Sequence, residues 1–225
     1  MQKMTKLSFV LLAAVVVGPV WADVKLPQIF SDNMVLQRDA KVPIWGMAEP
    51  GERVTVIFAG QSKSNRTGAD GKWMLKLDPM PADALGAVLT VEGKNQLTRD
   101  NVLVGDVWLC SGQSNMEWWL EKSVNGKQEV VDADYPTIRH FSLPYVCKID
   151  PQPDVGPEAV WRVCRPENIG SFSGVAYFFG REVWKKLNVP VGLIDASWGG
   201  TRIEPWISPA GFQSVPALKS ISDKV

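Results

Sequence analysis

Cys110-Ser111-Gly112-Gln113-Ser114-Asn115-Met116-Glu117 follows an apolar run over residues 102–109, and this stretch decides the fold. The run predicts a buried strand, and Gly112 gives the backbone a flexible turn before an expected helix. A hydroxyl placed there stands at the rim of a sheet, beside the free N–H groups of a helix N-terminus. Ser114 is therefore the candidate nucleophile.

A serine nucleophile normally needs a general base, and the sequence contains one histidine, His140. His140 lies in Ile138-Arg139-His140-Phe141-Ser142, a strand-like segment, so we predict a structural or surface strand residue rather than the base. Asp106 resembles a triad acid by position only, and we predict that it is a turn or cap residue.

A second glycine-rich strand end, Ser197-Trp198-Gly199-Gly200-Thr201, follows the apolar segment 191–198. Parallel strands deliver their carboxyl ends to the same sheet edge, where α/β folds keep their sites. We therefore expect this loop to lie beside Ser114.

Composition excludes several classes of function. Lys and Arg total 24, as do Asp and Glu, so the net charge is zero and no nucleic-acid partner is expected. No His/Cys cluster has metal-ligand spacing, so we predict no metal and no cofactor. The ten tryptophans suit both core packing and stacking on sugars. Trp45 and Trp73, on predicted strands, are expected in the core.

Residues 1–22 have the pattern of a signal peptide. Lys3 and Lys6 precede an apolar run over residues 7–17, and Val20-Trp21-Ala22 fits a cleavage site. We expect a protein exported to the periplasm or medium, with no membrane contact after cleavage. The alternative is an uncleaved anchor helix, although the run is short for a membrane span.

Export permits disulfides, and the chain has three cysteines. Cys147 and Cys164 flank a proline-rich loop and are candidates for a bridge, with three unpaired thiols as the alternative. Cys110, inside the apolar run, is expected to be a buried free thiol.

Residues 23–101 have the pattern of a small antiparallel β-sandwich. Segments 54–58 and 73–77 alternate apolar and polar residues, and Asp70-Gly71 is a strong hairpin signal. Short strands at even spacing without a helical stripe favour a sandwich.

Residues 102–225 have the pattern of an α/β layer with a parallel sheet. Residues 171–187 predict a helix with Ser171 as N-cap. Its expected apolar stripe consists of Val175, Phe178, Phe179, Val183 and Leu187. The expected strands are 102–109, 138–143 and 191–198.

The segment 205–225 is loop-like, with no closing strand or helix expected. An α/β domain beginning at Val102 would have about three sheet strands, against roughly five to six on average. We therefore expect this domain to be unfinished.

Several segments resemble the sialate O-acetylesterase family within the SGNH hydrolases, and together they cover nearly all of the mature chain. The segments are Gly112-Gln113-Ser114-Asn115-Met116-Glu117-Trp118, 26–38, 43–46, 70–73, 172–182 and 192–201, with Glu204 and Trp206.

The resemblance implies a signal peptide (1–22), a β-sandwich (23–101) and the first part of an SGNH-type α/β hydrolase domain (102–225). It implies serine-dependent removal of acetyl groups from sugar hydroxyls, of the sialate 9-O-acetyl type, on an acetylated sugar or glycan. Ser114 would form the acetyl-enzyme, and its N–H and that of Gly199 or Gly200 would form the oxyanion hole.

The departures from the family pattern concern the base. Family members carry a later block resembling Gln-Gly-Glu-Ser-Asn, then a catalytic histidine with its acid, and neither is present in this sequence. The chain therefore resembles the front part of a longer, truncated esterase. We expect it to be weakly active or inactive alone.

Other residues near the two blocks are weaker candidates for substrate binding. Core packing is the alternative for the tryptophans, and a local salt bridge is the alternative for the charged pair. The candidates are Gln113, Asn115, Trp118, Trp198, Arg202 and Glu204. The alternative functions are an acetylxylan-type esterase and a non-catalytic carbohydrate-binding or structural fragment. The sequence leaves the oligomeric state open.

Overall fold

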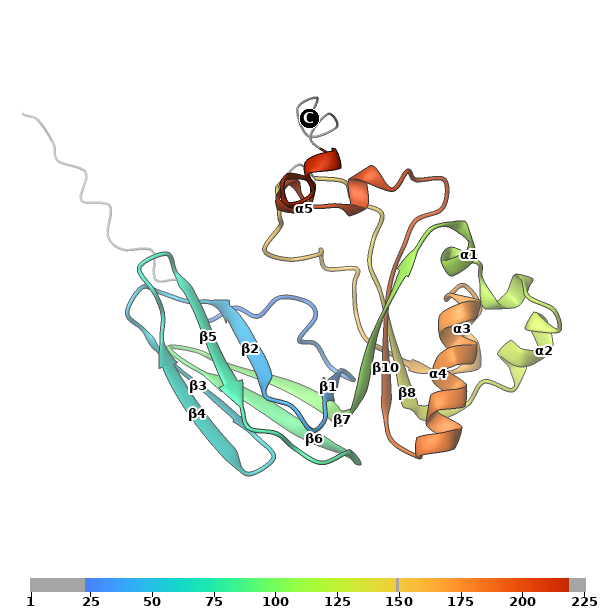
Figure 1. The fold of residues 1–225 in the computed structure, drawn as a ribbon. Helices are drawn as coiled ribbons and strands as arrows, with labels where there is room; N and C mark the ends of the chain where they lie inside the picture. The colour runs from blue at the N-terminus through green and yellow to red at the C-terminus, as the bar shows by residue number, and fades with distance from the viewer. Residues whose placement is uncertain (1–22, 149, 219–225) are drawn as a thin grey trace, which may run out of the picture.

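The computed structural model describes residues 23–148 and 150–218 (Figure 1). An eight-stranded mixed sheet has the strand order β4-β3-β6-β7-β10-β8-β9, with β1 paired to β7, and a separate two-stranded sheet joins β2 to β5. The expected signal peptide lies outside the described residues. No helix in the described part is long and apolar enough to cross a membrane.

The strands are β1 (Val35–Gln37), β2 (Val42–Met47), β3 (Arg53–Phe58), β4 (Gln61–Arg66), β5 (Lys72–Leu77), β6 (Asp83–Glu92), β7 (Gln96–Gly112), β8 (Tyr135–Ser142), β9 (Arg162–Cys164) and β10 (Val191–Ser197). The helices are α1 (Ser114–Glu117), α2 (Gly126–Val131), α3 (Pro166–Ile169), α4 (Gly174–Leu187) and α5 (Pro209–Ser214). Short 3-10 turns are η1 (Leu120–Lys122), η2 (Glu204–Trp206) and η3 (Pro216–Leu218).

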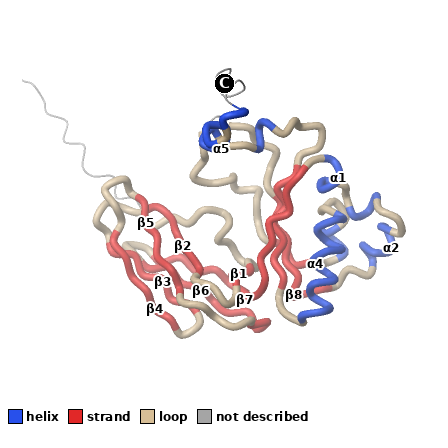
Figure 2. The backbone as a smooth tube through the Cα atoms, viewed as in Figure 1, coloured by secondary structure: helices blue, strands red, loops and turns tan. Residues whose placement is uncertain are grey.

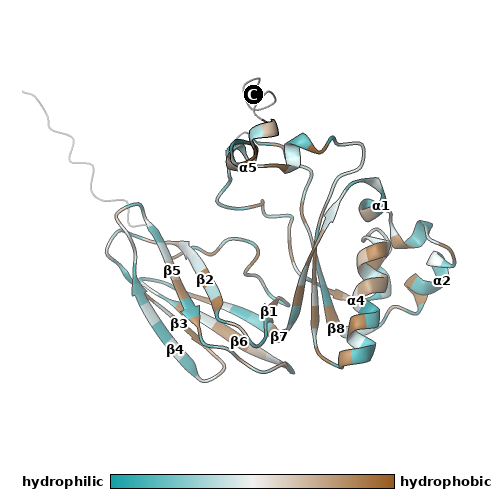
Figure 3. Ribbon diagram, viewed as in Figure 1, coloured by the Kyte–Doolittle hydropathy of each residue, from teal (hydrophilic) through white to brown (hydrophobic). Residues whose placement is uncertain are grey.

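The predicted fold class, antiparallel strands followed by a parallel α/β layer, is confirmed. The strands β7, β10 and β8 are parallel neighbours, whereas β3, β4 and β6 pair antiparallel. Figure 3 shows hydrophobic residues along the strands of both parts. The strict alternation predicted for β3 and β5 is also confirmed, because each strand buries every second residue.

One strand, β7, belongs to both parts of the fold. Its first part pairs antiparallel with β6 and parallel with β1, and from Asp106 to Gly112 it pairs with β10 (Figure 2). The boundary expected between residues 101 and 102 falls inside this strand.

The Asp70-Gly71 signal marks a turn, but the hairpin prediction is wrong. The turn leads from β4 in the large sheet to β5 in the small one, and β5 pairs with β2. The tight hairpin joins β3 to β4 at Ala59-Gly60, where both residues have positive φ (47° and 73°). Positive φ at both positions matches a type I′ turn, which twists in the sense the strands require.

The core position expected for Trp45 is wrong, although Trp73 is buried as predicted. Ile44 faces inward on β2, so its neighbour Trp45 points to the other face and is 37% exposed. Burial of residues 102–109 on both faces is also wrong, because Trp108 and Leu109 are exposed. Within the described residues this end of β7 pairs only with β10, which leaves it at the sheet edge.

The helix expected over residues 171–187 forms as α4, but Ser171 is not its cap. Ser173 is the N-cap and accepts a hydrogen bond from the Ala176 N–H at 3.1 Å. The expected stripe is only partly buried, with Val175, Phe179 and Leu187 exposed. Gly180 instead faces the sheet, where a Cβ would lie 2.7 Å from Leu193 Cδ1, so small residues let α4 approach β10 closely.

The prediction that no helix follows residue 205 is wrong, because α5 forms there. Ser208 caps it by accepting from the Gly211 N–H, and Pro209 occupies its first position. A serine cap followed by proline is a helix-start signal that the glycine and proline content concealed.

All three cysteines are free. Cys110 is buried, as expected, and the possible Cys147–Cys164 bridge is not formed. Cys164 lies inside the α/β core, whereas Cys147 is exposed.

Candidate functional site

Ser114 lies where the sequence predicts, directly after β7, as the first residue of α1. The helix after the turn is a single turn long, so its macrodipole is small. The Ser114 side chain is exposed, and its hydroxyl has no hydrogen-bond partner in the described residues. The structure thus presents a free, accessible hydroxyl at the carboxyl end of a parallel strand.

The two glycine-containing loops meet, as expected from the parallel strands. Gly112 pairs with Ser197, and its carbonyl accepts from the Trp198 N–H at 3.0 Å. The Gln113 side-chain amide donates to the Thr201 carbonyl. Gln113, a candidate substrate-binding residue, therefore joins the two loops.

Gly199 lies against Ser114 and Glu117. A Cβ built on Gly199 would lie 3.2 Å from Ser114 Oγ and would collide with the Glu117 carboxylate. The Gly199 N–H donates to Glu117 Oε2 at 2.5 Å. Only glycine fits this position, and its N–H is already hydrogen-bonded.

Tyr145 holds the other side of the same carboxylate. Its hydroxyl donates to Glu117 Oε1, and its ring stacks on Trp198 with centroids 5.1 Å apart. Burial, with the neighbouring Glu117 charge, raises the pKa of Tyr145 to about 12, so the hydroxyl stays protonated at neutral pH. Glu117 thus connects the turn that carries Ser114, the second glycine loop and the segment after β8.

Gly200 differs from Gly199. Its φ of +76° lies in the left-handed region that favours glycine, and a Cβ there would meet no atom within 4 Å. Its N–H has no hydrogen-bond partner among residues 23–148 and 150–218.

His140 is a buried structural residue, in agreement with the sequence analysis. It pairs with Leu193 in the middle of the sheet, and its Nε2 lies 3.0 Å from Asn168 Oδ1. Its register partner across the sheet is Trp108, about 13 Å along β7 before Gly112 at 3.3 Å per residue. Burial lowers the pKa of His140 to about 4. It cannot serve as the base of Ser114 from this position.

Two aspartates near β7 and β10 also have structural partners. Asp106 forms a two-point ion pair with Arg38, with Nε–Oδ1 at 2.8 Å, inside β7 rather than at the turn or cap that was predicted. Asp195 accepts from the Ser197 hydroxyl at 2.6 Å, and burial raises its pKa.

The other candidates lie around the same sheet edge. Asn115 and Trp118 are exposed, and Trp198 is half-buried beneath Tyr145. Arg202 and Glu204 form no ion pair within the part of the chain that is described, so the proposed salt bridge between them is absent there.

Sequence reasoning missed Glu117 and Tyr145 as site residues. Glu117 was inside the quoted motif, and its position three residues after Ser114 places it one helical turn from the candidate nucleophile. Tyr145 carried no signal, because its contact with Glu117 joins residues 28 positions apart across α2 and β8.

The relatives found by comparing this sequence with known proteins share one description, sialate O-acetylesterase. The chain is 35% identical to human sialate O-acetylesterase over 227 residues, covering 89% of this chain and 43% of that protein. It is 34% identical to the rat sialate O-acetylesterase over 215 residues, covering 87% of this chain and 40% of the relative. No family model matches the chain.

The fold has a solved counterpart. The crystal structure of a carbohydrate acetylesterase from Xanthomonas citri superposes with a TM-score of 0.80 at 35% identity, covering 87% of this chain and 45% of that one. The chain spans less than half the length of each of these proteins.

Proposed function

We propose that this chain, whose sequence is similar to part of the sialate O-acetylesterases and whose fold is that of part of a carbohydrate acetylesterase, supplies the nucleophile and oxyanion donors of a carbohydrate O-acetylesterase. The observation that carries the proposal is the position of Gly199 against Ser114, which joins the two predicted blocks into one site. The partial coverage agrees with the resemblance to the N-terminal part of such enzymes.

In the proposed reaction, Ser114 Oγ loses its proton and attacks the acetyl carbonyl carbon, the bond from that carbon to the sugar oxygen breaks, and the sugar oxygen takes up a proton and leaves as a hydroxyl. The carbonyl oxygen becomes an oxyanion, which N–H donors fixed in advance stabilise. The Ser114 N–H is one donor. Gly200 supplies the second, because its N–H has no partner in the described residues whereas the Gly199 N–H is held by Glu117.

The sugar occupies the exposed surface beside Ser114. Trp118 and Asn115 are accessible there and offer an apolar face and an amide. An acetylated sialic acid and an acetylated xylan both fit this chemistry, and we keep the sialate 9-O-acetyl type as the first candidate. Export through the segment 1–22 remains part of the proposal.

A general base is needed to deprotonate Ser114, and the described residues bring no histidine to it. We therefore expect slow turnover by the 225-residue chain, reduced on the order of 10⁴ to 10⁶ relative to a complete triad. Acetyl transfer to Ser114 needs the same deprotonation and should also be slow, so the test uses an aryl acetate, whose phenolate leaves without taking up a proton.

The test is incubation of the folded chain with an aryl acetate, followed by intact-mass and peptide mapping for a 42 Da acetyl adduct, as expected for C₂H₂O. We expect slow acetylation on Ser114 that disappears in Ser114→Ala and persists in Ser111→Ala. Equal labelling of Ser114→Ala would contradict the proposal. Release of acetate from acetylated sialic acid or xylan oligomers then compares the two substrate classes.

A further inference from the structure

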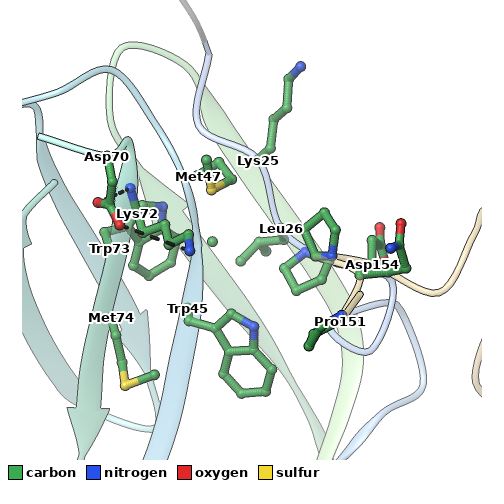
Figure 4. Close-up of a pocket in the computed structure, with 14 residues that line it drawn as sticks. Lys25, Leu26, Trp45, Met47, Asp70, Lys72, Trp73, Met74, Pro151 and Asp154 are labelled. Atoms are coloured by element: carbon green, nitrogen blue, oxygen red, sulfur yellow. Dashed lines mark hydrogen bonds and ion pairs between the residues drawn. The ribbon is translucent and has the colours of Figure 1, made fainter. Parts of the chain in front are cut away.

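A groove of about 1000 Å³ lies on the β-sandwich (Figure 4). Its walls are residues 25–27, the strands β2 and β5, and the loop 151–154. Figure 1 shows β2 and β5 on the opposite side of the parallel sheet from α1, which carries Ser114. The groove is therefore separate from the candidate catalytic site.

The floor of the groove is apolar, although it is formed by the outward-facing positions of β2 and β5, where polar residues are expected. Trp45, Met47 and Met74 are 37%, 39% and 49% exposed, and all three lie on the outer face of the small sheet. Trp45 and Met74 are direct partners across the β2–β5 pair. Core packing does not explain these residues, because the opposite face of the same strands packs in the core.

The Trp45 indole is held in place from one side. Phe30, which is buried, meets it edge-on with ring centroids 4.5 Å apart and planes at 76°. Edge-to-face contact is a favourable arrangement for an aromatic pair. The indole is thus an accessible apolar surface at the floor of the groove, supported on one side by Phe30.

The charges on the rim are balanced. Two lysines (Lys25 and Lys72) and two aspartates (Asp70 and Asp154) line it, and Lys72 Nζ lies 4.0 Å from Asp70 Oδ2. Asp154 Oδ1 accepts from the Gln28 N–H at 2.9 Å. A rim without excess charge suits an uncharged ligand that both donates and accepts hydrogen bonds.

The backbone edge beside the groove is already paired. The Lys25 N–H donates to the Met47 carbonyl at 2.8 Å, and the Met47 N–H donates back at 3.0 Å. A peptide therefore cannot add to β2 as a further strand at this point. Recognition in the groove must rest on the side chains.

We propose that this groove binds an uncharged oligosaccharide, with one sugar ring stacked on Trp45 and its hydroxyls hydrogen-bonded to the charged rim. The choice of a glycan rests on the proposed function, since the uncharged sugars of an acetylated glycan, of either substrate class, belong to the molecule that Ser114 deacetylates. The groove holds unmodified parts of that polymer, away from the reacting acetyl group.

The test uses the full chain carrying Ser114→Ala, so that no acetyl transfer contributes. Xylohexaose and cellohexaose are titrated by calorimetry and followed by intrinsic tryptophan fluorescence. We expect binding that Trp45→Ala weakens at least about tenfold, from the loss of one aromatic contact. Trp108→Ala, a tryptophan of similar exposure on β7, should bind as the parent does.

Circular dichroism and thermal unfolding establish that each variant is folded, and Met74→Glu gives a second change in the floor of the groove. Equal affinity in Trp45→Ala and the parent would overturn the proposal, as would binding of a proline-rich peptide with none of either hexasaccharide. Failure of Ser114 acetylation with intact hexasaccharide binding would contradict the proposed function and leave the groove supported.

Discussion

The backbone N–H of Gly199 donates to the carboxylate of Glu117 at 2.5 Å, although 82 positions separate the two residues in the sequence. Because Glu117 also accepts from Tyr145, one carboxylate fixes the second loop against the turn that carries Ser114. The geometry of the candidate site therefore depends on a residue that is not expected to react.

Glu117→Ala should lower the stability of the fold and loosen the second loop. The substitution leaves the partly buried Gly199 N–H without its acceptor, which costs up to about 1–3 kcal/mol, whereas the exposed Tyr145 hydroxyl can bond to water instead. Urea unfolding measures the loss. Tyr145→Phe is the matched control and should cost less, because it keeps the Gly199 contact; an equal loss in both variants would contradict this account.

Gly199→Ala and Gly200→Ala should have different consequences. The methyl group that Gly199→Ala adds would displace the Glu117 carboxylate, crowd Ser114 and shift the loop that carries the proposed donor Gly200, so acetylation of Ser114 should fall on the order of 10²-fold, as for loss of an oxyanion donor. At Gly200 the space is open and only the positive φ opposes alanine, at a cost of about 1 kcal/mol. Acetyl-enzyme formation by mass spectrometry and urea unfolding separate the two effects.

His140 should make the fold sensitive to acid. Its folded-state pKa of about 4 lies below the ordinary 6.5, so the unfolded chain binds a proton first as the pH falls. The stabilisation is present above pH 6.5 and is lost between pH 6.5 and 4, up to about 3 kcal/mol. His140→Gln should flatten the pH dependence of the unfolding free energy over that window. It should not change Ser114 acetylation, and a loss of acetylation in a folded variant would restore His140 as a candidate base.

Asp195 should change the pH dependence of the unfolding free energy in the opposite direction from His140. Burial, with Glu117 nearby, raises its pKa, so the folded state binds its proton more readily than the unfolded chain. The ionised carboxylate therefore opposes folding at neutral pH, and this opposition fades as the pH falls through the raised pKa. Asp195→Asn should raise the unfolding free energy at pH 7 while retaining an acceptor for Ser197. Lower stability of a folded Asp195→Asn protein at pH 7 would refute this.

The three cysteines should differ sharply in reactivity. Burial raises the pKa of Cys110 to about 11 and that of Cys164 to about 12, whereas Cys147 is exposed. Because the thiolate is the reactive form, iodoacetamide should label Cys147 in the native protein and the other two only after unfolding. Peptide mapping identifies the labelled sites, and a Cys147–Cys164 bridge would show as loss of native labelling that a reductant restores.

Strand alternation and apolar runs were sufficient to predict β3, β5, β8 and β10, because these signals depend only on which faces are buried. They were insufficient where contacts between distant parts of the chain determine which side chains are buried. Gly180 packs against Leu193 and turns the expected stripe of α4 partly outward, and no local pattern reveals that contact. Ser114 and the second loop were predictable from their motifs. Tyr145 was not, since only the folded chain brings it to Glu117.

Because β7 is hydrogen-bonded to β6 and β1 at one end and to β10 at the other, it links the antiparallel and the parallel parts of one sheet. Hydrogen–deuterium exchange along β7 should then report a single opening event, with similar protection before and after residue 102. The sandwich and the parallel layer would lose structure together. A proteolytic fragment ending at residue 101 would be cut within β7 and would lack the part of that strand that pairs with β10. Its amides should not keep the native protection pattern.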